Sequence, residues 1–229
     1  MRTLSRRHKE NTKKTKNNVY SNLEESIVAL KETANAKFVE SVELHATLNI
    51  DPKYANQQLR TTVTLPHGVG KQIRIAVLTN EENFEEVKAI NVDIVGNDDL
   101  IEQINQGNLN FDLLVATPNM MPKLAKLGRV LGPKGLMPSP KSGTVTTNLS
   151  ETLNEFKKGK FEYKADKTGI VHVNFGKVNF TNTQLAENLT ALYRSIEQNR
   201  PSGVKGKYFK NLSICTTMGP SLKLDLSIF

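Results

Sequence analysis

The feature that most constrains the fold is a change in hydrophobic pattern along the chain. Apolar and polar side chains alternate from Val42 to Ile50, and again from Leu212 to Leu226 around Met218-Gly219-Pro220. Period-two alternation predicts strands with one buried and one exposed face. Amphipathic helices are expected from about Leu23 to Ala34 and from Asn182 to Gln198. Both ends of the chain are therefore expected to build an α+β domain with antiparallel strands.

The middle of the chain has a different pattern, in which short apolar runs alternate with helical segments. Strand-helix-strand-helix-strand order predicts a parallel sheet with crossover helices, a Rossmann-like α/β domain. The expected strands cover 73–77, 92–95 and 113–115, and the expected helices cover 81–89 and 98–105.

These two patterns predict one domain inserted into another. The chain is punctuated by Pro66-His67-Gly68-Val69-Gly70 and again by Gly159-Lys160. We expect residues 19–67 and 160–229 to form the α+β domain and residues 68–159 to form the inserted α/β domain. Residues 1–18 contain seven Lys or Arg and one Glu without hydrophobic periodicity, which predicts a basic, flexible arm.

The net charge of +8 is concentrated at the two ends of the chain. Lysine and arginine displace counterions from phosphate, so basic ends suggest a polyanion, but a solvated tail explains them equally well. No apolar run approaches the roughly 20 residues that span a membrane, and the N-terminus does not resemble a secretory signal. The single cysteine, Cys215, is expected to be a buried, inert thiol.

Catalytic and metal-binding motifs are weak. His67-Gly68-Val69-Gly70-Lys71-Gln72 ends like a phosphate-binding loop, but Leu65 and Gln72 stand where that loop needs Gly and Ser or Thr. The histidines, which are His8, His45, His67 and His172, lie in separate elements without metal-ligand spacing. Neither a metal nor a cofactor is expected. The alternative is an enzyme or small-ligand-binding protein with its site after the parallel strands, where α/β proteins often bind ligands.

Two segments carry a functional pattern. Residues 127–145, LGRVLGPKGLMPSPKSGTV, are too rich in Gly and Pro for a regular element, and 113–150 contain no acidic residue. This basic region predicts contact with a phosphate backbone; a packing loop with solvated lysines is the alternative. Its candidate residues are Lys123, Lys126, Arg129, Lys134 and Lys141.

The second segment is Thr216-Thr217-Met218-Gly219-Pro220. Hydroxyls, a thioether and a bare glycine backbone suit the shallow minor groove of RNA. A simple turn at a strand end is the alternative.

These segments resemble the ribosomal protein L one family. LGRVLGPKGLMPSPKSGTV and TTMGP are similar to its signatures, as are AKFVESVELHATLNID, LPHGVGKQIRIAV, NFDLLVATP and DKTGIVHVNFGK. The similarity runs in order from about Ala36 to Pro220. Several long segments in the right order make chance agreement improbable, although each motif alone is weak.

The resemblance implies a function without catalysis. The α+β domain is expected to bind a three-way junction of large-subunit ribosomal RNA, and both domains to form a mobile stalk that accompanies deacylated tRNA through the exit site. Repression of its own messenger RNA is implied for bacterial members. Composition and the DKTGIVHVNFGK segment resemble plastid members, so we expect a ribosome of the chloroplast stroma, with a bacterial cytoplasm as the alternative.

The resemblance also assigns RNA-contacting positions. Ser41 stands where family members often have Thr, and both residues offer a hydroxyl. The expected contacts are Phe38, Ser41, Thr168, His172, Lys177, Thr216, Thr217, Met218, Gly219 and Pro220.

Overall fold

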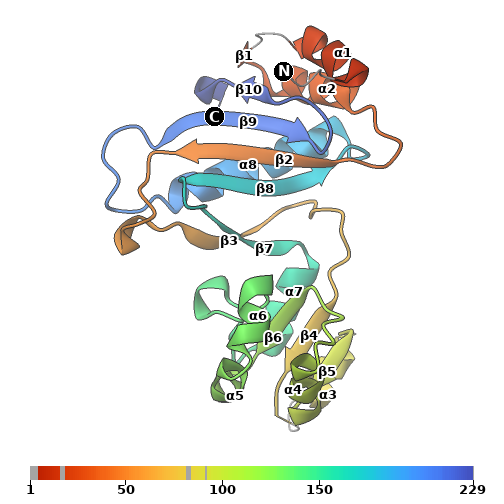
Figure 1. The fold of residues 1–229 in the computed structure, drawn as a ribbon, viewed down its shortest axis with the longest axis vertical. Helices are drawn as coiled ribbons and strands as arrows, with labels where there is room; N and C mark the ends of the chain where they lie inside the picture. The colour runs from red at the N-terminus through yellow and green to blue at the C-terminus, as the bar shows by residue number, and fades with distance from the viewer. Residues whose placement is uncertain (1–4, 16–18, 81–83, 91, 229) are drawn as a thin grey trace. The chain divides into compact units, whose positions relative to one another are not determined.

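The computed structural model describes residues 5–15, 19–80, 84–90 and 92–228 (Figure 1). Its internal contacts divide the chain into two compact units. Met1–Gly70 and Phe161–Phe229 form the first unit, and Lys71–Lys160 form the second. The divisions fall three residues and one residue later than the sequence pattern places them. Each unit has hydrophobic clusters of its own and is described by itself.

The first unit is built on a five-stranded sheet in the order β1-β10-β9-β2-β8. β1 and β10 are parallel, and the other neighbouring pairs are antiparallel. The expected C-terminal hairpin is confirmed, with Leu222 opposite Ile214. β3 (Arg60–Thr64) and β7 (Lys160–Lys164) form a separate two-stranded sheet. The five strands are β1 Val19–Tyr20, β2 Ser41–Leu48, β8 Ile170–Lys177, β9 Phe209–Thr216 and β10 Leu222–Leu224, and short 3-10 helices lie at η1 Ala55–Gln57 and η5 Leu226–Ile228.

Two helices, α2 (Leu23–Thr33) and α8 (Asn182–Gln198), cover one face of this sheet (Figure 1). Alternate residues of β2 point into the core that the sheet shares with these helices, and the residues between them stay partly exposed. The predicted two-faced strand is therefore confirmed. We call the opposite side of the sheet the open face. It carries Ser41, Glu43, His45, Thr47, His172, Asn174, Ser213 and Cys215.

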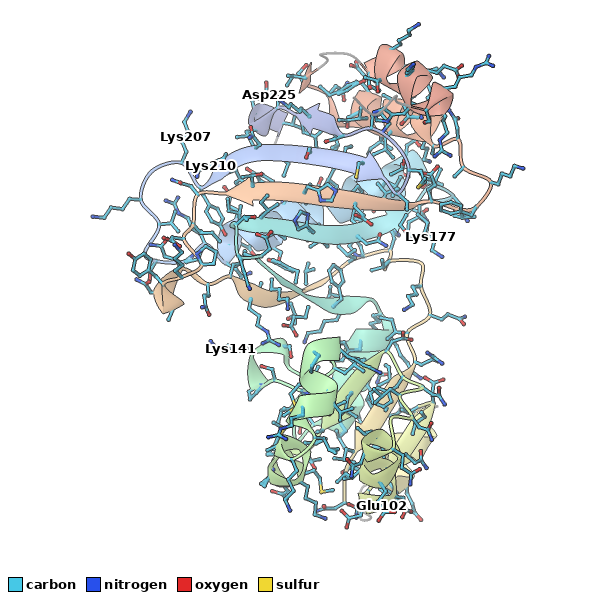
Figure 2. The ribbon with its side chains drawn as sticks, viewed as in Figure 1. Glu102, Lys141, Lys177, Lys207, Lys210 and Asp225 are labelled. Atoms are coloured by element: carbon cyan, nitrogen blue, oxygen red, sulfur yellow. The ribbon has the colours of Figure 1, made fainter. Side chains whose placement is uncertain are left out.

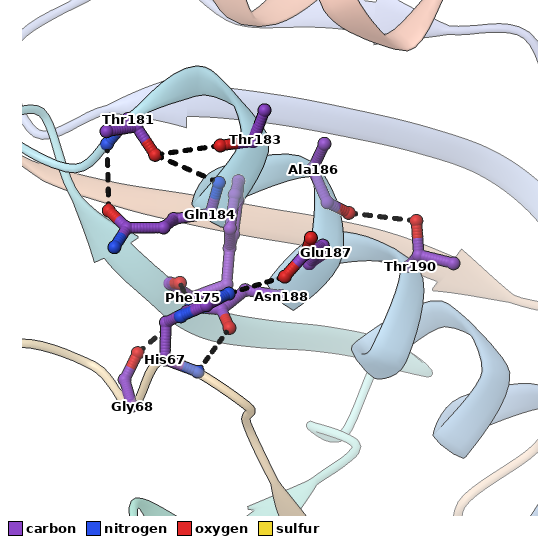
Figure 3. Close-up of polar contacts among 10 residues, drawn as sticks. All are labelled: His67, Gly68, Phe175, Thr181, Thr183, Gln184, Ala186, Glu187, Asn188 and Thr190. Atoms are coloured by element: carbon purple, nitrogen blue, oxygen red, sulfur yellow. Dashed lines mark hydrogen bonds and ion pairs between the residues drawn. The ribbon is translucent and has the colours of Figure 1, made fainter.

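The start and middle of α8 are fixed by side-chain hydrogen bonds (Figure 3). Thr181 accepts from the Gln184 backbone N–H, and Gln184 Oε1 accepts from the Thr181 N–H, which is a capping box. Asn188 is fully buried; its amide donates to the carbonyls of Phe175 and Gly68. Its Oδ1 accepts from the backbone N–H of His67 at 3.1 Å. One satisfied amide thus ties α8 to β8 and to the segment that leaves the sheet at 67–68.

The second unit is a parallel sheet in the order β5-β4-β6 with helices on both faces. Ala76 and Leu78 of β4 pack with α4, α5 and α6, whereas Ile75 and Val77 pack with α3 and α7. The predicted parallel sheet is confirmed; residues 81–83 of the helix expected over 81–89 lie outside the described residues. The elements are β4 Ile75–Leu78, α3 Phe84–Ala89, β5 Ile94–Gly96, α4 Asp98–Asn105, β6 Leu113–Ala116, η3 Pro118–Met120, α5 Met121–Ala125, α6 Gly128–Lys134, η4 Pro140–Ser142 and α7 Leu149–Lys157.

Among the helices that the structure describes, none combines the length and apolar character needed to cross a membrane.

The prediction of a flexible arm over residues 1–18 is wrong for Arg6–Thr15, which form α1; residues 1–4 and 16–18 lie outside the described residues. The Ser5 hydroxyl accepts from the His8 N–H at the start of α1, and Asn11 is buried. The Asn11 amide donates to the Thr33 carbonyl at 2.9 Å, and its Oδ1 accepts from the Asn35 amide. A polar anchor holds this helix, so hydrophobic periodicity did not reveal it.

The expectation that residues 127–145 contain no regular element is also wrong. Gly128–Lys134 of this segment form α6 and Pro140–Ser142 form η4. Gly135, which has φ +71°, follows the last residue of α6 as its C-cap. Leu124, Leu127 and Leu131 are buried at helical spacing. Pro133 lies in the last turn of α6, where its missing N–H removes only one hydrogen bond from the helix. The helical spacing of the leucines therefore predicts this segment better than its Gly and Pro content does.

Candidate RNA-binding site

The β9–β10 turn and the segment leading into β2 meet at one end of the open face. The Ser41 N–H donates to Thr217 Oγ1, and the Thr217 N–H donates to the Ser41 carbonyl, both at 3.1 Å. Phe38 is 55% exposed and Met218 is 48% exposed. Two large apolar side chains therefore reach solvent from segments that are bound to each other.

Glu40 holds these two segments together. Its side chain is only 2% exposed, and its carboxylate accepts from the Ala36 N–H at 3.0 Å and from the Met218 N–H at 2.9 Å. Its backbone carbonyl accepts from the Val178 N–H at 3.0 Å. Sequence reasoning missed Glu40, because an acid beside exposed Phe38 gives no signal that its partners include a backbone N–H 178 positions away.

Position 219 has no room for a side chain. A Cβ at this position would lie 2.3 Å from Thr216 Oγ1, well inside the closest contact that real Cβ atoms make. Thr216 itself is only 2% exposed, and its Oγ1 has no hydrogen-bond partner among the described residues. Its burial is incompatible with the predicted direct RNA contact through the side chain, because it faces the core as the inward residue of β9. Thr216 instead supports the turn.

Lys177 lies at the same end of the sheet as the turn. It is the last residue of β8 and pairs with Ser41 in the antiparallel register (Figure 2). A hollow of about 260 Å³ adjoins this region, lined by residues that include Phe38, Val39 and Glu40. We call the assembled region the turn surface. It comprises Phe38, Ser41, Lys177, Thr217, Met218, Gly219 and Pro220.

Two predicted contacts lie away from the turn surface. Thr168 is in the turn before β8, where its hydroxyl and N–H donate to the Asp166 carboxylate. The strand that follows this turn runs seven steps from Ile170 to Lys177, or roughly 24 Å at 3.4 Å per step. His172 lies between them on the open face, 51% exposed. The structure thus spreads the predicted residues along the face rather than gathering all of them.

The five basic candidates of the second unit are all exposed. Lys123 and Lys126 lie in and just after α5, Arg129 and Lys134 lie in α6, and Lys141 lies in η4 (Figure 2). Lys123 pairs with Asp98 at 2.6 Å. Among the residues that the structure describes, no ion pair involves the other four. Four exposed cations without an ion pair among the described residues thus lie on or directly after short helices of this unit.

Cys215 is not the fully buried thiol that the sequence predicts. The inward positions of β9 are Leu212, Ile214 and Thr216, so Cys215 points to the open face and is partly exposed. Burial raises its pKa, and the Glu43 carboxylate raises it further. A raised pKa leaves little nucleophilic thiolate near neutral pH.

The geometry defines a mixed α/β protein whose turn surface is exposed, fixed and largely uncharged, and the mixed α/β fold is consistent with the family that comparisons with known proteins find. Residues 30–220 match the Ribosomal protein L1p/L10e family. Over its full length, the chain is 80% identical to the full-length "Large ribosomal subunit protein uL1c" of Phaeodactylum tricornutum (strain CCAP 1055/1) and 76% identical to that of Trieres chinensis. Over 227 residues, it is 55% identical to the "Large ribosomal subunit protein uL1" of Prochlorococcus marinus (strain MIT 9215), covering 99% and 96% of the two chains.

The chain therefore belongs to the ribosomal protein L1p/L10e family. The resemblance found in the sequence motifs is confirmed. The expectation that the chain is not an enzyme is confirmed too, because its relatives are named as ribosomal proteins. No observation supports the alternative of a ligand site at residues 127–145, because this segment contains α6, whose leucines pack against the parallel sheet.

Proposed function

We propose that the chain is a protein of the large ribosomal subunit that binds large-subunit ribosomal RNA directly through the turn surface. The first unit is then the RNA-binding domain and the second unit a domain inserted into it. The family match and the names of the relatives support a place in the large subunit. The turn surface supplies the chemistry for the RNA contact.

One observation carries this proposal: Phe38 and Met218 are exposed while the buried Glu40 carboxylate fixes the Met218 backbone. A flexible loop would fold its apolar side chains away from water, whereas this one is held open. Fixed apolar groups with Thr217 and Ser41 hydroxyls beside them suit the wide minor groove of an RNA helix and its 2′-hydroxyls. Recognition then rests on shape, with Lys177 as the one charge on the turn surface.

The second unit has a different role in this proposal. Its free cations, Lys126, Arg129, Lys134 and Lys141, suit a passing phosphate backbone rather than one fixed RNA site. We assign them to contact with exit-site tRNA as the two units form the mobile stalk that assists release of deacylated tRNA. Where the messenger of this chain carries a fold like the ribosomal site, the same turn surface would bind it and repress translation.

The compartment follows from the relatives rather than from the fold. The two relatives named uL1c, the plastid-type protein, are 80% and 76% identical to this chain, whereas the cyanobacterial uL1 is 55% identical. These names support a plastid ribosome, and we propose that this ribosome lies in the chloroplast stroma.

Titration of the full chain against large-subunit ribosomal RNA fragments, with unrelated RNA as competitor, tests the proposal. Met218→Ala should weaken specific binding about tenfold, because it removes an apolar contact worth roughly 1–2 kcal/mol. Its slope against salt should stay unchanged, since no charge is lost. Val28→Ala is the control, because Val28 is also an exposed apolar residue (43%) but lies on α2. Equal affinity of Met218→Ala and the wild type would remove the turn surface from the interface.

A further inference from the structure

Three metal-binding side chains converge on the open face of the five-stranded sheet. Glu43 and His45 lie on β2, and Cys215 lies opposite Glu43 on β9. His45 Nε2 is 3.0 Å from Cys215 Sγ and 3.9 Å from Glu43 Oε2. One donor atom from each residue lies within 4.8 Å of the other two. Sequence spacing could not show this group, because strand pairing brings residue 45 beside residue 215.

A second histidine continues the chain of contacts from His45. His45 Nδ1 is 2.7 Å from His172 Nδ1, and His172 Nε2 is 3.7 Å from Asp166 Oδ2. Hydrogen bonds from the Ile170 N–H and from Thr168 hold the pKa of Asp166 below its usual value, so it is a carboxylate at neutral pH. This carboxylate already accepts from the Thr168 N–H and hydroxyl and from the Ile170 N–H, and 3.7 Å is too long for a hydrogen bond from His172.

The contact between the two Nδ1 atoms has one donor and one acceptor when both rings are neutral. In the tautomer that can bind a cation, His45 Nδ1 donates to His172 Nδ1. The lone pair of His45 is then on Nε2, the atom that faces Cys215 and Glu43.

We propose that Cys215, His45 and Glu43 bind a divalent cation of the zinc class, with His172 orienting His45 from behind. A thiolate, an imidazole and a carboxylate are the donor types of Zn²⁺. The thiolate and the carboxylate carry two negative charges, which balance a divalent ion. A second hydrogen-bonded group behind a ligand histidine, as His172 is here, recurs at metal sites because it fixes ring orientation and tautomer.

The distances agree with a tetrahedral site that has one open position. Zinc bonds of about 2.3 Å to sulfur and about 2.0 Å to nitrogen place the two donors about 3.5 Å apart. The distance from His45 Nε2 to Cys215 Sγ, 3.0 Å, lies below this value. The distance from His45 Nε2 to Glu43 Oε2, 3.9 Å, lies above the about 3.3 Å that zinc bonds of about 2.0 Å to nitrogen and oxygen give, so small side-chain rotations suffice. β2 and β9 are inner strands of the sheet, and rigid strands hold donors more accurately than loops. Water fills the fourth position.

Calorimetric titration of the untagged, chelator-treated full chain with Zn²⁺ tests the site. We expect one ion per chain. Cys215→Ser and Glu43→Gln should each weaken binding at least tenfold, and His172→Ala should weaken it about tenfold through loss of orientation. Ser213→Ala is the matched control: Ser213 lies opposite His45 on the same face, and its loss should leave affinity unchanged. Circular dichroism establishes that each variant is folded.

Two further readouts need no variant. Co²⁺ in place of Zn²⁺ should give the intense visible bands of a tetrahedral site and a thiolate charge-transfer band. Zn²⁺ should also slow alkylation of Cys215, which is the only cysteine of the chain. A stoichiometry near zero, binding that survives in Cys215→Ser, or unchanged alkylation would overturn the proposal and leave the His45–Cys215 contact as a simple hydrogen bond.

Discussion

The turn surface of the first unit and the basic surface of the second, which comprises Lys126, Arg129, Lys134 and Lys141, differ in how they suit nucleic acid. The turn surface has one lysine, and a buried carboxylate and paired strands fix its apolar and hydroxyl groups. The basic surface has four exposed cations without ion pairs among the described residues, and they lie on or directly after the short helices α5, α6 and η4. Fixed uncharged groups read the shape of one folded RNA, whereas free cations attract any phosphate backbone. Specificity and mobility are thus assigned to separate units.

The largest effect on this difference between the two surfaces is expected when Glu40, which holds the turn surface in place, is removed. Glu40→Ala leaves the N–H groups of Ala36 and Met218 without their buried acceptor. Hydrogen bonds to charged groups contribute about 1.5–3 kcal/mol each. We therefore expect specific RNA affinity to fall about 100-fold and the unfolding midpoint to fall by several degrees.

Filter binding and thermal melting measure these two effects. Glu32→Ala is the matched control, because Glu32 is an exposed acid in the same unit and its loss should change neither value. If Glu40→Ala keeps full affinity, the anchored turn is not what the RNA recognises.

A smaller loss of RNA affinity is expected when a side chain is added inside the β9–β10 turn than when the Glu40 anchor is removed. Gly219→Ala places a Cβ 2.3 Å from Thr216 Oγ1, so the turn must shift, and we expect RNA affinity to fall about tenfold. In the double variant with Thr216→Ala the nearest atom becomes the Thr216 Cβ at 3.5 Å, an ordinary contact. The double variant should regain most of the affinity. A double variant as weak as Gly219→Ala would show that the RNA, rather than Thr216, needs the bare glycine.

The basic surface is expected to act through charge alone. Replacing Lys126, Lys134 and Lys141 with Ala should leave specific binding of the ribosomal RNA fragment within about twofold. Non-specific binding of tRNA should become less dependent on salt. The slope of log affinity against log salt concentration should become shallower by up to about 0.7–0.9 for each phosphate contact removed. Titrations at several salt concentrations measure both slopes. A large loss of specific affinity would mean that the two surfaces act as one.

The sequence predicted elements whose cause is local, and it failed where the cause is distant. α8 was predicted from Asn182 to Gln198 and has those bounds, because Thr181 caps it and leucines recur at helical spacing. α1 was missed because its anchor is the amide of Asn11, and the role of Glu40 was missed because the turn that it holds lies far along the chain. Thr216 and Gly219 sit in one motif, but only the strand direction shows that one is buried and the other fits against it.

The sharpest form of the comparison removes one surface completely. The hydrophobic cluster of the first unit draws residues from both chain ends, and the clusters of the second unit draw only on residues within it. Residues 1–70 joined by a few glycines to residues 161–229 should therefore fold alone, because no core residue is lost from the first unit. The shortened protein keeps Glu40, the turn surface and the hydrogen bonds that join Asn188 to residues 67–68.

We expect the shortened protein to melt cooperatively and to bind the ribosomal RNA fragment within about threefold of the full chain. The isolated second unit should show only salt-sensitive, non-specific binding. Calorimetry and the same RNA titration measure both properties. A folded first unit without specific binding would show that recognition needs groups from the second unit, and the assignment of specificity to one surface would be lost.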